Sequence, residues 1–121
     1  AVALYEVTGN EKLLRVMKKN GDLLYRHFVE NGAEGYPGHP EVELALMRLW
    51  RATGDEKYKE ACIMQWKWIE EHQVDKIGGE WWSELDEEGN PILSEAKGGN
   101  WKTSYHNGRT CMELLRRAGK F

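Results

Sequence analysis

Several features are scarce or missing in this sequence of 121 residues. It has no apolar run near the ~20 residues that span a bilayer, and no basic segment followed by an apolar one, so neither a membrane protein nor a signal peptide is predicted. Its formal net charge of −3 argues against a broad nucleic-acid-binding surface. Its two cysteines, Cys62 and Cys111, have neither C-x-x-C nor Cys/His metal spacing. We therefore expect a cytoplasmic protein without metal or cofactor, with both thiols as small core residues.

Tryptophan and glycine, by contrast, are abundant, with six and thirteen residues. Trp-rich and Gly-rich loops in a helical protein often build a site for a flat polar ligand, although each Trp taken alone is as often a core residue. The hydrophobic fraction of 40% and the charged fraction of 31% fit one soluble domain over residues 1–121.

Apolar spacing near 3.6 residues predicts five helices separated by turns that contain Gly. Gly21 falls on the apolar stripe of the second helix, where we expect two helices to approach closely. The expected helices cover about residues 1–7, 10–30, 40–53, 55–72 and 104–117. Residues 79–93 alternate around a turn at 86–90, which is typical of a short β-hairpin or a long ordered loop. We predict a mainly α fold of antiparallel helical hairpins with one short β-hairpin near residues 79–93.

An internal repeat links two parts of the chain at an offset of 45 residues, since LYEVTGNEKLL (4–14) matches LWRATGDEKYK (49–59). Each copy is a helix end, a Thr-Gly stop, an Asn or Asp cap and a new helix. Repeated helical hairpins of this period indicate a stacked array or a closed α/α toroid, in which each hairpin needs neighbours on both faces. Because five helices supply only part of a ring, we predict a homo-oligomer that completes it.

Two stretches of the sequence resemble two families of sugar-active enzymes. Residues 1–61, with ALYEVTGNEKLL and GYPGHPEVELALMRLWRATGDEKY, are similar to the catalytic toroid of the β-L-arabinofuranosidase glycoside hydrolases. Residues 64–117, with QWKWIEEHQVDKIGGEWWSELDEEGNP and WKTSYHNGRTCMELLRR, resemble the C-terminal end of the N-acylglucosamine 2-epimerase and cellobiose 2-epimerase superfamily. Both families are α/α six-hairpin toroids, so the resemblance implies a partial toroid. The mixed parentage points to a rare natural relative, a chimera, a designed chain or a fragment.

The motif WKTSYHNGR carries the predicted chemistry. His106 is expected in the first turn of the last helix, where the helix N-terminus disfavours the imidazolium and leaves the ring able to accept a proton. Arg109 lies three residues on, on the same face, where it could hold a sugar hydroxyl or an enediolate oxygen. The resemblance to the epimerases implies that His106 transfers protons next to the sugar carbonyl, with Arg109 and Tyr105 positioning the substrate. The alternative is that His106 only caps the helix.

Further candidates are aromatic residues and a second histidine. Trp101 and one of Trp81 and Trp82 are candidates to stack on the apolar face of a pyranose, because adjacent strand residues point in opposite directions. Core packing is the alternative role for these residues, and at least one of Trp81 and Trp82 is expected in the core. The resemblance to the arabinofuranosidases places His39 and Tyr36 beside the substrate, and His39 is the candidate for the second catalytic histidine that epimerases need. Its alternative role is to cap the third helix.

The sequence therefore predicts a sugar epimerase or isomerase that binds a mono- or oligosaccharide. The alternative is a non-catalytic or engineered, self-assembling toroid fragment that binds sugar at most. A glycoside hydrolase is disfavoured, because Cys62 and Cys111 lack the Cys-rich zinc motif of the arabinofuranosidases. No metal or cofactor is predicted for this chain.

Overall fold

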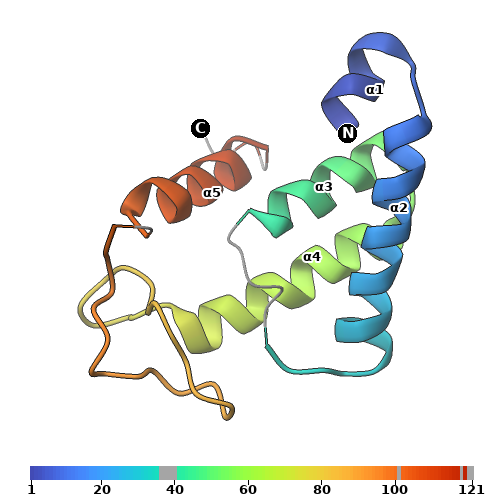
Figure 1. Ribbon diagram of the computed structural model, residues 1–121. Coiled ribbons are helices and arrows are strands. Elements are labelled where there is room, and N and C mark those ends of the chain that lie inside the picture. Colours follow the sequence, from blue (N-terminus) through green and yellow to red (C-terminus); the bar gives the residue numbers. More distant parts are fainter. Residues whose placement is uncertain (36–40, 101, 118, 120–121) are drawn as a thin grey trace.

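The computed structural model describes residues 1–35, 41–100, 102–117 and 119, except for the side chains of Ser104 and His106. Two of its helices continue directly into short π-helical segments, so the described part of the chain contains five helical rods, as predicted (Figure 1). The segments are α1 (Val2–Thr8), α2 (Lys12–Leu24), η1 (Tyr25–Glu30), α3 (Val42–Thr53), α4 (Glu56–Trp68), η2 (Ile69–Gln73) and α5 (Ser104–Arg117). None of these helices combines the length and the apolar character that a membrane crossing requires.

The corner between α1 and α2 is closed by hydrogen bonds of its own side chains. The Thr8 hydroxyl donates to the Leu4 carbonyl at 2.6 Å and accepts from the Asn10 amide at 3.2 Å. The Asn10 side chain then accepts from the Lys12 amide at 3.0 Å, at the start of α2. Gly9, with φ of 70°, supplies the left-handed conformation that ends α1.

The corner between α3 and α4 repeats each of these bonds 45 residues later. The Thr53 hydroxyl donates to the Leu49 carbonyl at 2.7 Å and accepts from the Asp55 amide at 3.3 Å. Asp55 accepts from the Lys57 amide at 3.4 Å, and Gly54 has φ of 71°. The repeat predicted from the sequence is therefore confirmed, because both copies fold into the same helix corner.

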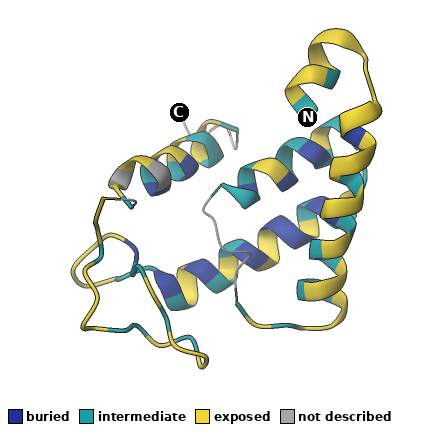
Figure 2. Ribbon diagram, viewed as in Figure 1, coloured by how far each residue is buried: buried dark blue, intermediate teal, exposed yellow. Residues whose placement is uncertain are grey.

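The hydrophobic core lies where α2 packs against the antiparallel pair of α3 and α4 (Figures 1 and 2). Its members face inward at helical spacing and come from all three helices. They are Leu14, Leu46, Leu49, Tyr58, Ala61 and Cys62. The loop 74–103 leads from η2 to α5, which lies on the far side of α3 from α2 (Figure 1).

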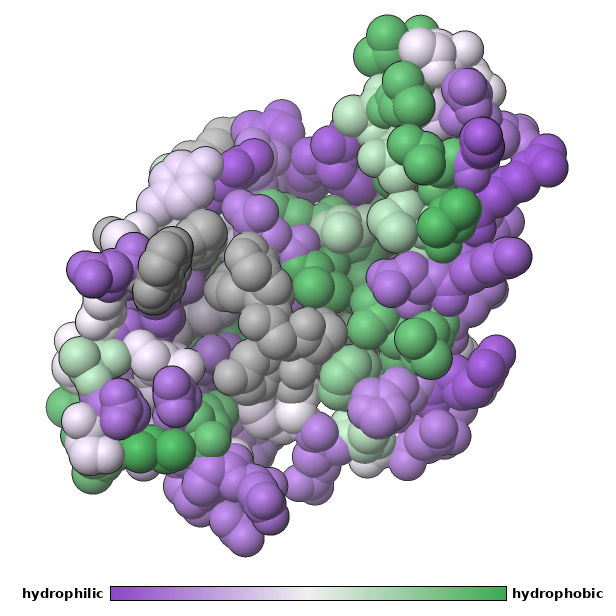
Figure 3. Space-filling model, in the orientation of Figure 1, coloured by the Kyte–Doolittle hydropathy of each residue, from purple (hydrophilic) through white to green (hydrophobic). Residues whose placement is uncertain are grey.

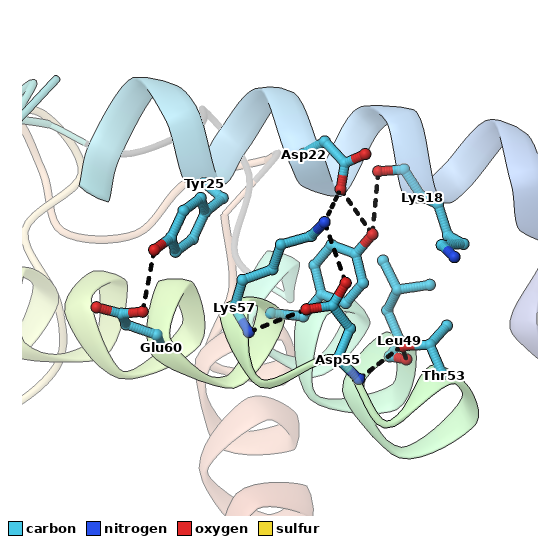
Figure 4. A network of polar contacts seen from close by, with 9 residues as sticks. Lys18, Asp22, Tyr25, Leu49, Thr53, Asp55, Lys57 and Glu60 are labelled. Atoms are coloured by element: carbon cyan, nitrogen blue, oxygen red, sulfur yellow. Dashed lines mark hydrogen bonds and ion pairs between the residues drawn. The ribbon is translucent and has the colours of Figure 1, made fainter. Parts of the chain in front are cut away.

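Gly21 lies where α2 meets α3 and α4. A Cβ atom on Gly21 would come within 2.7 Å of the Tyr58 ring and 2.8 Å of Leu49. The Tyr58 hydroxyl donates to Asp22 at 2.7 Å, and Asp22 also pairs with Lys57 at 2.9 Å (Figure 4). Burial and the hydrogen bond to Asp22 raise the pKa of Tyr58 to about 12. The close approach predicted at Gly21 is confirmed, since the missing side chain lets the buried Tyr58 ring reach α2.

The β-hairpin predicted near residues 79–93 is wrong. The described residues contain no strand there, only two isolated antiparallel bridges, Val74–Trp81 and Leu85–Pro91. Pro91 has no N–H to donate, and Glu80 has a left-handed φ of 68°, so an extended ladder cannot propagate from either bridge. The turn itself forms, because the Asp86 carboxylate accepts from the Asn90 amide at 2.7 Å. The alternative expectation, a long ordered loop, describes this segment.

Candidate functional site

The predicted proton-transfer residue lies at the start of α5. Because α5 begins at Ser104, His106 lies in its first turn, as predicted, although its side chain is outside the described part of the structure. Three other predicted site residues, Tyr36, His39 and Trp101, lie outside the described residues. The roles of all four residues therefore stay predictions.

Two predicted substrate-binding residues are brought together on α5. The Arg109 guanidinium donates to the Tyr105 hydroxyl at 2.8 Å, one helical turn away. The same Arg109 nitrogen lies 3.7 Å from a carboxylate oxygen of Glu41, just before α3. More than half of the surface of Tyr105 (60%) and of the Arg109 side chain (52%) is exposed. This pair therefore places a cation and a phenol at the surface beside the first turn of α5.

Asn107, on the opposite face of α5, is a residue that sequence reasoning missed. Asn107 is 5% exposed, and its side-chain amide donates to the Glu80 carboxylate. The bond ties the first turn of α5 to the loop after η2, and so it fixes the backbone that carries His106. Thr110, one turn on, is fully buried, and its hydroxyl has no hydrogen-bond partner among the described residues. The sequence signal that could have identified Asn107 is its spacing from Thr110, since two polar residues three positions apart lie on the inward face of α5.

Lys97 anchors the loop 74–103 from within. Its ammonium donates hydrogen bonds to the Asp75 carboxylate and, at 2.9 Å, to the Gly79 carbonyl. It also lies 4.2 Å from the centre of the Trp82 ring, within reach of a cation–π interaction. These three contacts hold the loop in shape where a strand ladder is missing.

Trp81 is held differently from its half-buried neighbour Trp82. Trp81 is 6% exposed and meets Trp66 of α4 edge to face, with ring centres 6.3 Å apart. The Lys102 ammonium donates to the Trp81 carbonyl and to the Lys97 carbonyl. Burial lowers the pKa of Lys102. In this structure Trp81 packs between α4 and the loop, and its stacking on a sugar stays a prediction.

The Asp75–Lys97 pair predicts a pH dependence of loop stability. The Lys97 ammonium and the Gly78 and Ile77 amides lower the pKa of Asp75 to about 2. A folded-state pKa below the usual 3.8 means that the contribution is complete above about pH 4 and is lost as the pH falls toward 2. We expect Asp75→Asn to lower the thermal midpoint at pH 7, and this gap to the wild type to be much smaller at pH 2, where about half of the Asp75 carboxyl is protonated. Scanning calorimetry checks this; an equal gap at both pH values would contradict it.

The zinc site implied by the resemblance to the arabinofuranosidases does not fit the described residues. These residues contain no cluster of three His, Cys, Asp or Glu side chains that could hold a metal ion. The Cys62 thiol is buried and donates to the Glu43 carbonyl at 3.3 Å. Burial and the charge of Glu43 raise the pKa of Cys62 to about 12, and burial also raises that of Cys111. Both thiols are therefore protonated at neutral pH, whereas zinc ligands and nucleophiles are thiolates.

Comparison with known proteins finds both predicted resemblances. The family model of the β-L-arabinofuranosidase GH127 catalytic domain matches residues 1–81, which extends beyond the predicted boundary at residue 61. The chain is 38% identical over 78 residues to a cellobiose 2-epimerase of Ruminococcus albus, covering 64% of this chain and 20% of that protein. It is 48% identical over 60 residues to a non-reducing end β-L-arabinofuranosidase of Bifidobacterium longum, covering 48% of this chain and 9% of that protein.

Solved structures agree with the sequence relatives. The structure of cellobiose 2-epimerase from Spirochaeta thermophila matches 67% of this chain with a TM-score of 0.61 and 34% identity. A sugar epimerase from a ruminal bacterium matches 64% with a TM-score of 0.59 and 35% identity. This chain covers 20% of each of those structures, so it spans about a fifth of the epimerases that it matches. The predicted mainly α fold, built from helical hairpins of the toroid type, is therefore confirmed. Because the family model matches its first 81 residues, the chain belongs to the β-L-arabinofuranosidase GH127 catalytic-domain family.

Proposed function

We propose that the chain contributes the His106 end of a sugar 2-epimerase site in an α/α toroid. The observation that carries the proposal is the arrangement of α5: a first turn tied down by the Asn107–Glu80 bond, beside the exposed pair of Tyr105 and Arg109. The similarity to cellobiose 2-epimerases in both sequence and structure supports it. The substrate is a mono- or oligosaccharide with a reducing end.

The proposed reaction is a proton transfer at the carbon next to the carbonyl of the opened sugar. The His106 imidazole takes the proton from C2, and the electron pair moves to the carbonyl oxygen, which gives an enediolate. The Arg109 guanidinium stabilises the charge that develops on this oxygen, as Tyr105 positions the neighbouring hydroxyl. A second acid/base group returns a proton to the opposite face of C2, which inverts its configuration. His39 is the candidate for this second group.

Further helices have to complete this site. The matched epimerase structure is about five times as long as the segment that it shares with this chain, and the family resemblance implies a toroid of six hairpins. We propose that other copies of the chain supply the missing hairpins in a homo-oligomer, with His39 coming from the same or a neighbouring copy. Trp101, Trp81 and Tyr36 are proposed to line the sugar site, and the cytoplasmic location stays a prediction.

A second candidate function is a non-catalytic toroid fragment that binds sugar at most. The exposure of Tyr105 and of the Arg109 side chain favours it, because both groups lie open to solvent. A glycosidase is less well supported, although one relative carries that activity in its name, because the raised pKa of Cys62 leaves no thiolate to act as a nucleophile.

Incubation with cellobiose in D₂O separates these functions. Proton NMR follows the C2 proton of the reducing sugar, while chromatography follows released glucose. We expect deuterium at C2, followed by the epimer with mannose configuration, and no free glucose. Free glucose without exchange at C2 would identify a hydrolase. No reaction, with or without a calorimetric binding signal, would leave the non-catalytic function and contradict the epimerase.

A further inference from the structure

We propose that the chain assembles head to tail, with an exposed apolar stripe on α2 of one copy packed into an open groove between α3, α4 and α5 of the next. The inference rests on the homo-oligomer of the proposed function, but not on its proton chemistry. It names the two surfaces that form the contact. The two surfaces belong to helices at opposite ends of the molecule, α2 and α5 (Figure 1).

The groove has helical walls on three sides. Its volume is about 840 Å³. A mostly apolar channel between three helices has the shape that accepts another helix, whose side chains fill the grooves between its neighbours. Six of the residues that line it are Met47 and Trp50 of α3, Cys62, Ile63 and Trp66 of α4, and Leu114 of α5.

The stripe lies on α2. This helix has apolar side chains on the side that packs in the core and also on a side that stays exposed to solvent. Leu14 and Gly21 on one side are buried in the core. Leu13, Val16 and Leu23 follow at helical spacing on the other side and are 47%, 54% and 57% exposed. In Figure 3, hydrophobic side chains gather over α1 and on the side of α2 that faces α3, while the outer edge of α2 in this view is mostly hydrophilic. Exposed apolar side chains that share one helix face mark a surface that another protein surface covers.

The internal repeat identifies the second copy of this chain as the partner. The α1–α2 corner has the same hydrogen bonds as the α3–α4 corner, so the first hairpin has the geometry of a stacking unit. Within the chain this hairpin already packs against the second one, through contacts of α1 and α2 with α3. When the first hairpin of another copy enters the groove, the same succession of hairpins continues across the interface.

The interface is heterologous, because a stripe meets a groove instead of a second stripe. Such contacts build a closed ring when the rotation between neighbours divides a full turn, and a filament when it does not. A test must therefore distinguish head-to-tail contacts from a symmetric dimer.

Light scattering coupled to size exclusion on the full chain makes this distinction with two variants. Val16→Glu puts a charge into the stripe and Ile63→Glu puts one into the groove, at positions that are 54% and 43% exposed in the single chain. We expect the wild type to be heavier than one chain of 14.0 kDa and each variant to be a monomer. An equimolar mixture of the variants should form a dimer, because each one keeps the surface that the other has lost.

Leu93→Glu is the matched control, since Leu93 is 76% exposed but lies in the loop before α5, and it should leave the wild-type mass unchanged. Leu23→Glu and Leu115→Glu form a second pair, used if circular dichroism shows a misfolded variant. A monomeric wild type, or a mixture that stays monomeric, overturns the proposal and leaves the groove to a different occupant. This experiment measures mass and not activity. If the wild type assembles but does not exchange the C2 proton, the epimerase proposal is contradicted and the assembly proposal stands.

Discussion

Replacing His106 by alanine is expected to slow deuterium exchange at C2 of cellobiose by at least ~100-fold, because general acid–base catalysis by a positioned side chain contributes about 10²–10⁴-fold. The proton at C2 is removed only by a base within hydrogen-bond reach. The first turn of α5 holds His106 on a backbone that the Asn107–Glu80 bond fixes. The exchange rate, measured by proton NMR at saturating sugar, is the readout.

His27→Ala is the matched control for this experiment. His27 is exposed in η1, far along the chain from α5, and takes no part in the proposed site. We expect this variant to exchange the C2 proton at the wild-type rate. Circular dichroism should show the same helix content for both variants. Exchange at the wild-type rate in His106→Ala would remove His106 from the mechanism and leave its role as a cap of α5.

Arg109 gives a second, graded test of the same site. Arg109→Lys keeps the positive charge but loses the planar fork of N–H donors that can hold an oxygen and the Tyr105 hydroxyl together. We expect this variant to retain exchange at a rate between those of the wild type and His106→Ala. Rates equal to the wild type would show that Arg109 contacts Tyr105 and Glu41 without touching the sugar.

The helices and their corners could be predicted from the sequence, because their determinants are local. In each corner a Thr, a Gly and an Asn or Asp lie within three residues and bond to backbone atoms no more than four residues away. Such short-range bonds leave a recognisable pattern, and the repeat at an offset of 45 residues reproduced it. The resemblance to the two families added the toroid, which five helices alone do not specify.

The loop before α5 could not be predicted in the same way, because its shape depends on contacts between distant residues. Lys97 reaches Asp75, 22 residues earlier, and Lys102 reaches the Trp81 carbonyl, 21 residues earlier. The alternation of apolar and polar residues along 79–93 favoured a hairpin. In the structure, however, the ammonium groups of Lys97 and Lys102, and not a paired strand, donate hydrogen bonds to the Gly79 and Trp81 carbonyls.

The candidate site shows the same division. The Tyr105–Arg109 contact follows from helical spacing. The contacts of Asn107 with Glu80 and of Arg109 with Glu41 join separate segments and have no local signal. Sequence reasoning therefore found residues that share one turn of α5, and it missed the residue that fixes this turn against the rest of the protein.

Gly21→Ala is expected to lower the free energy of unfolding by about 1–3 kcal/mol, the usual cost of forcing an extra carbon into a packed core. The new Cβ would lie 2.7 Å and 2.8 Å from the Tyr58 ring and Leu49. Tyr58 cannot move aside easily, since it is fully buried and its hydroxyl donates a hydrogen bond to Asp22. Chemical denaturation followed by circular dichroism measures the change.

Gly108→Ala gives the opposite expectation for the same substitution. Gly108 also lies within a helix, α5, but a Cβ atom there meets none of the described residues within 4 Å. Alanine is favoured over glycine in a helix by about 1 kcal/mol, so this variant should be more stable than the wild type. The same gain in helix propensity applies to Gly21→Ala, so that variant is destabilised only if the steric clash with Tyr58 and Leu49 costs more than this gain. If both variants were stabilised, α2 and α4 would be free to move apart at Gly21, and the Tyr58 contact would not limit how closely the two hairpins pack.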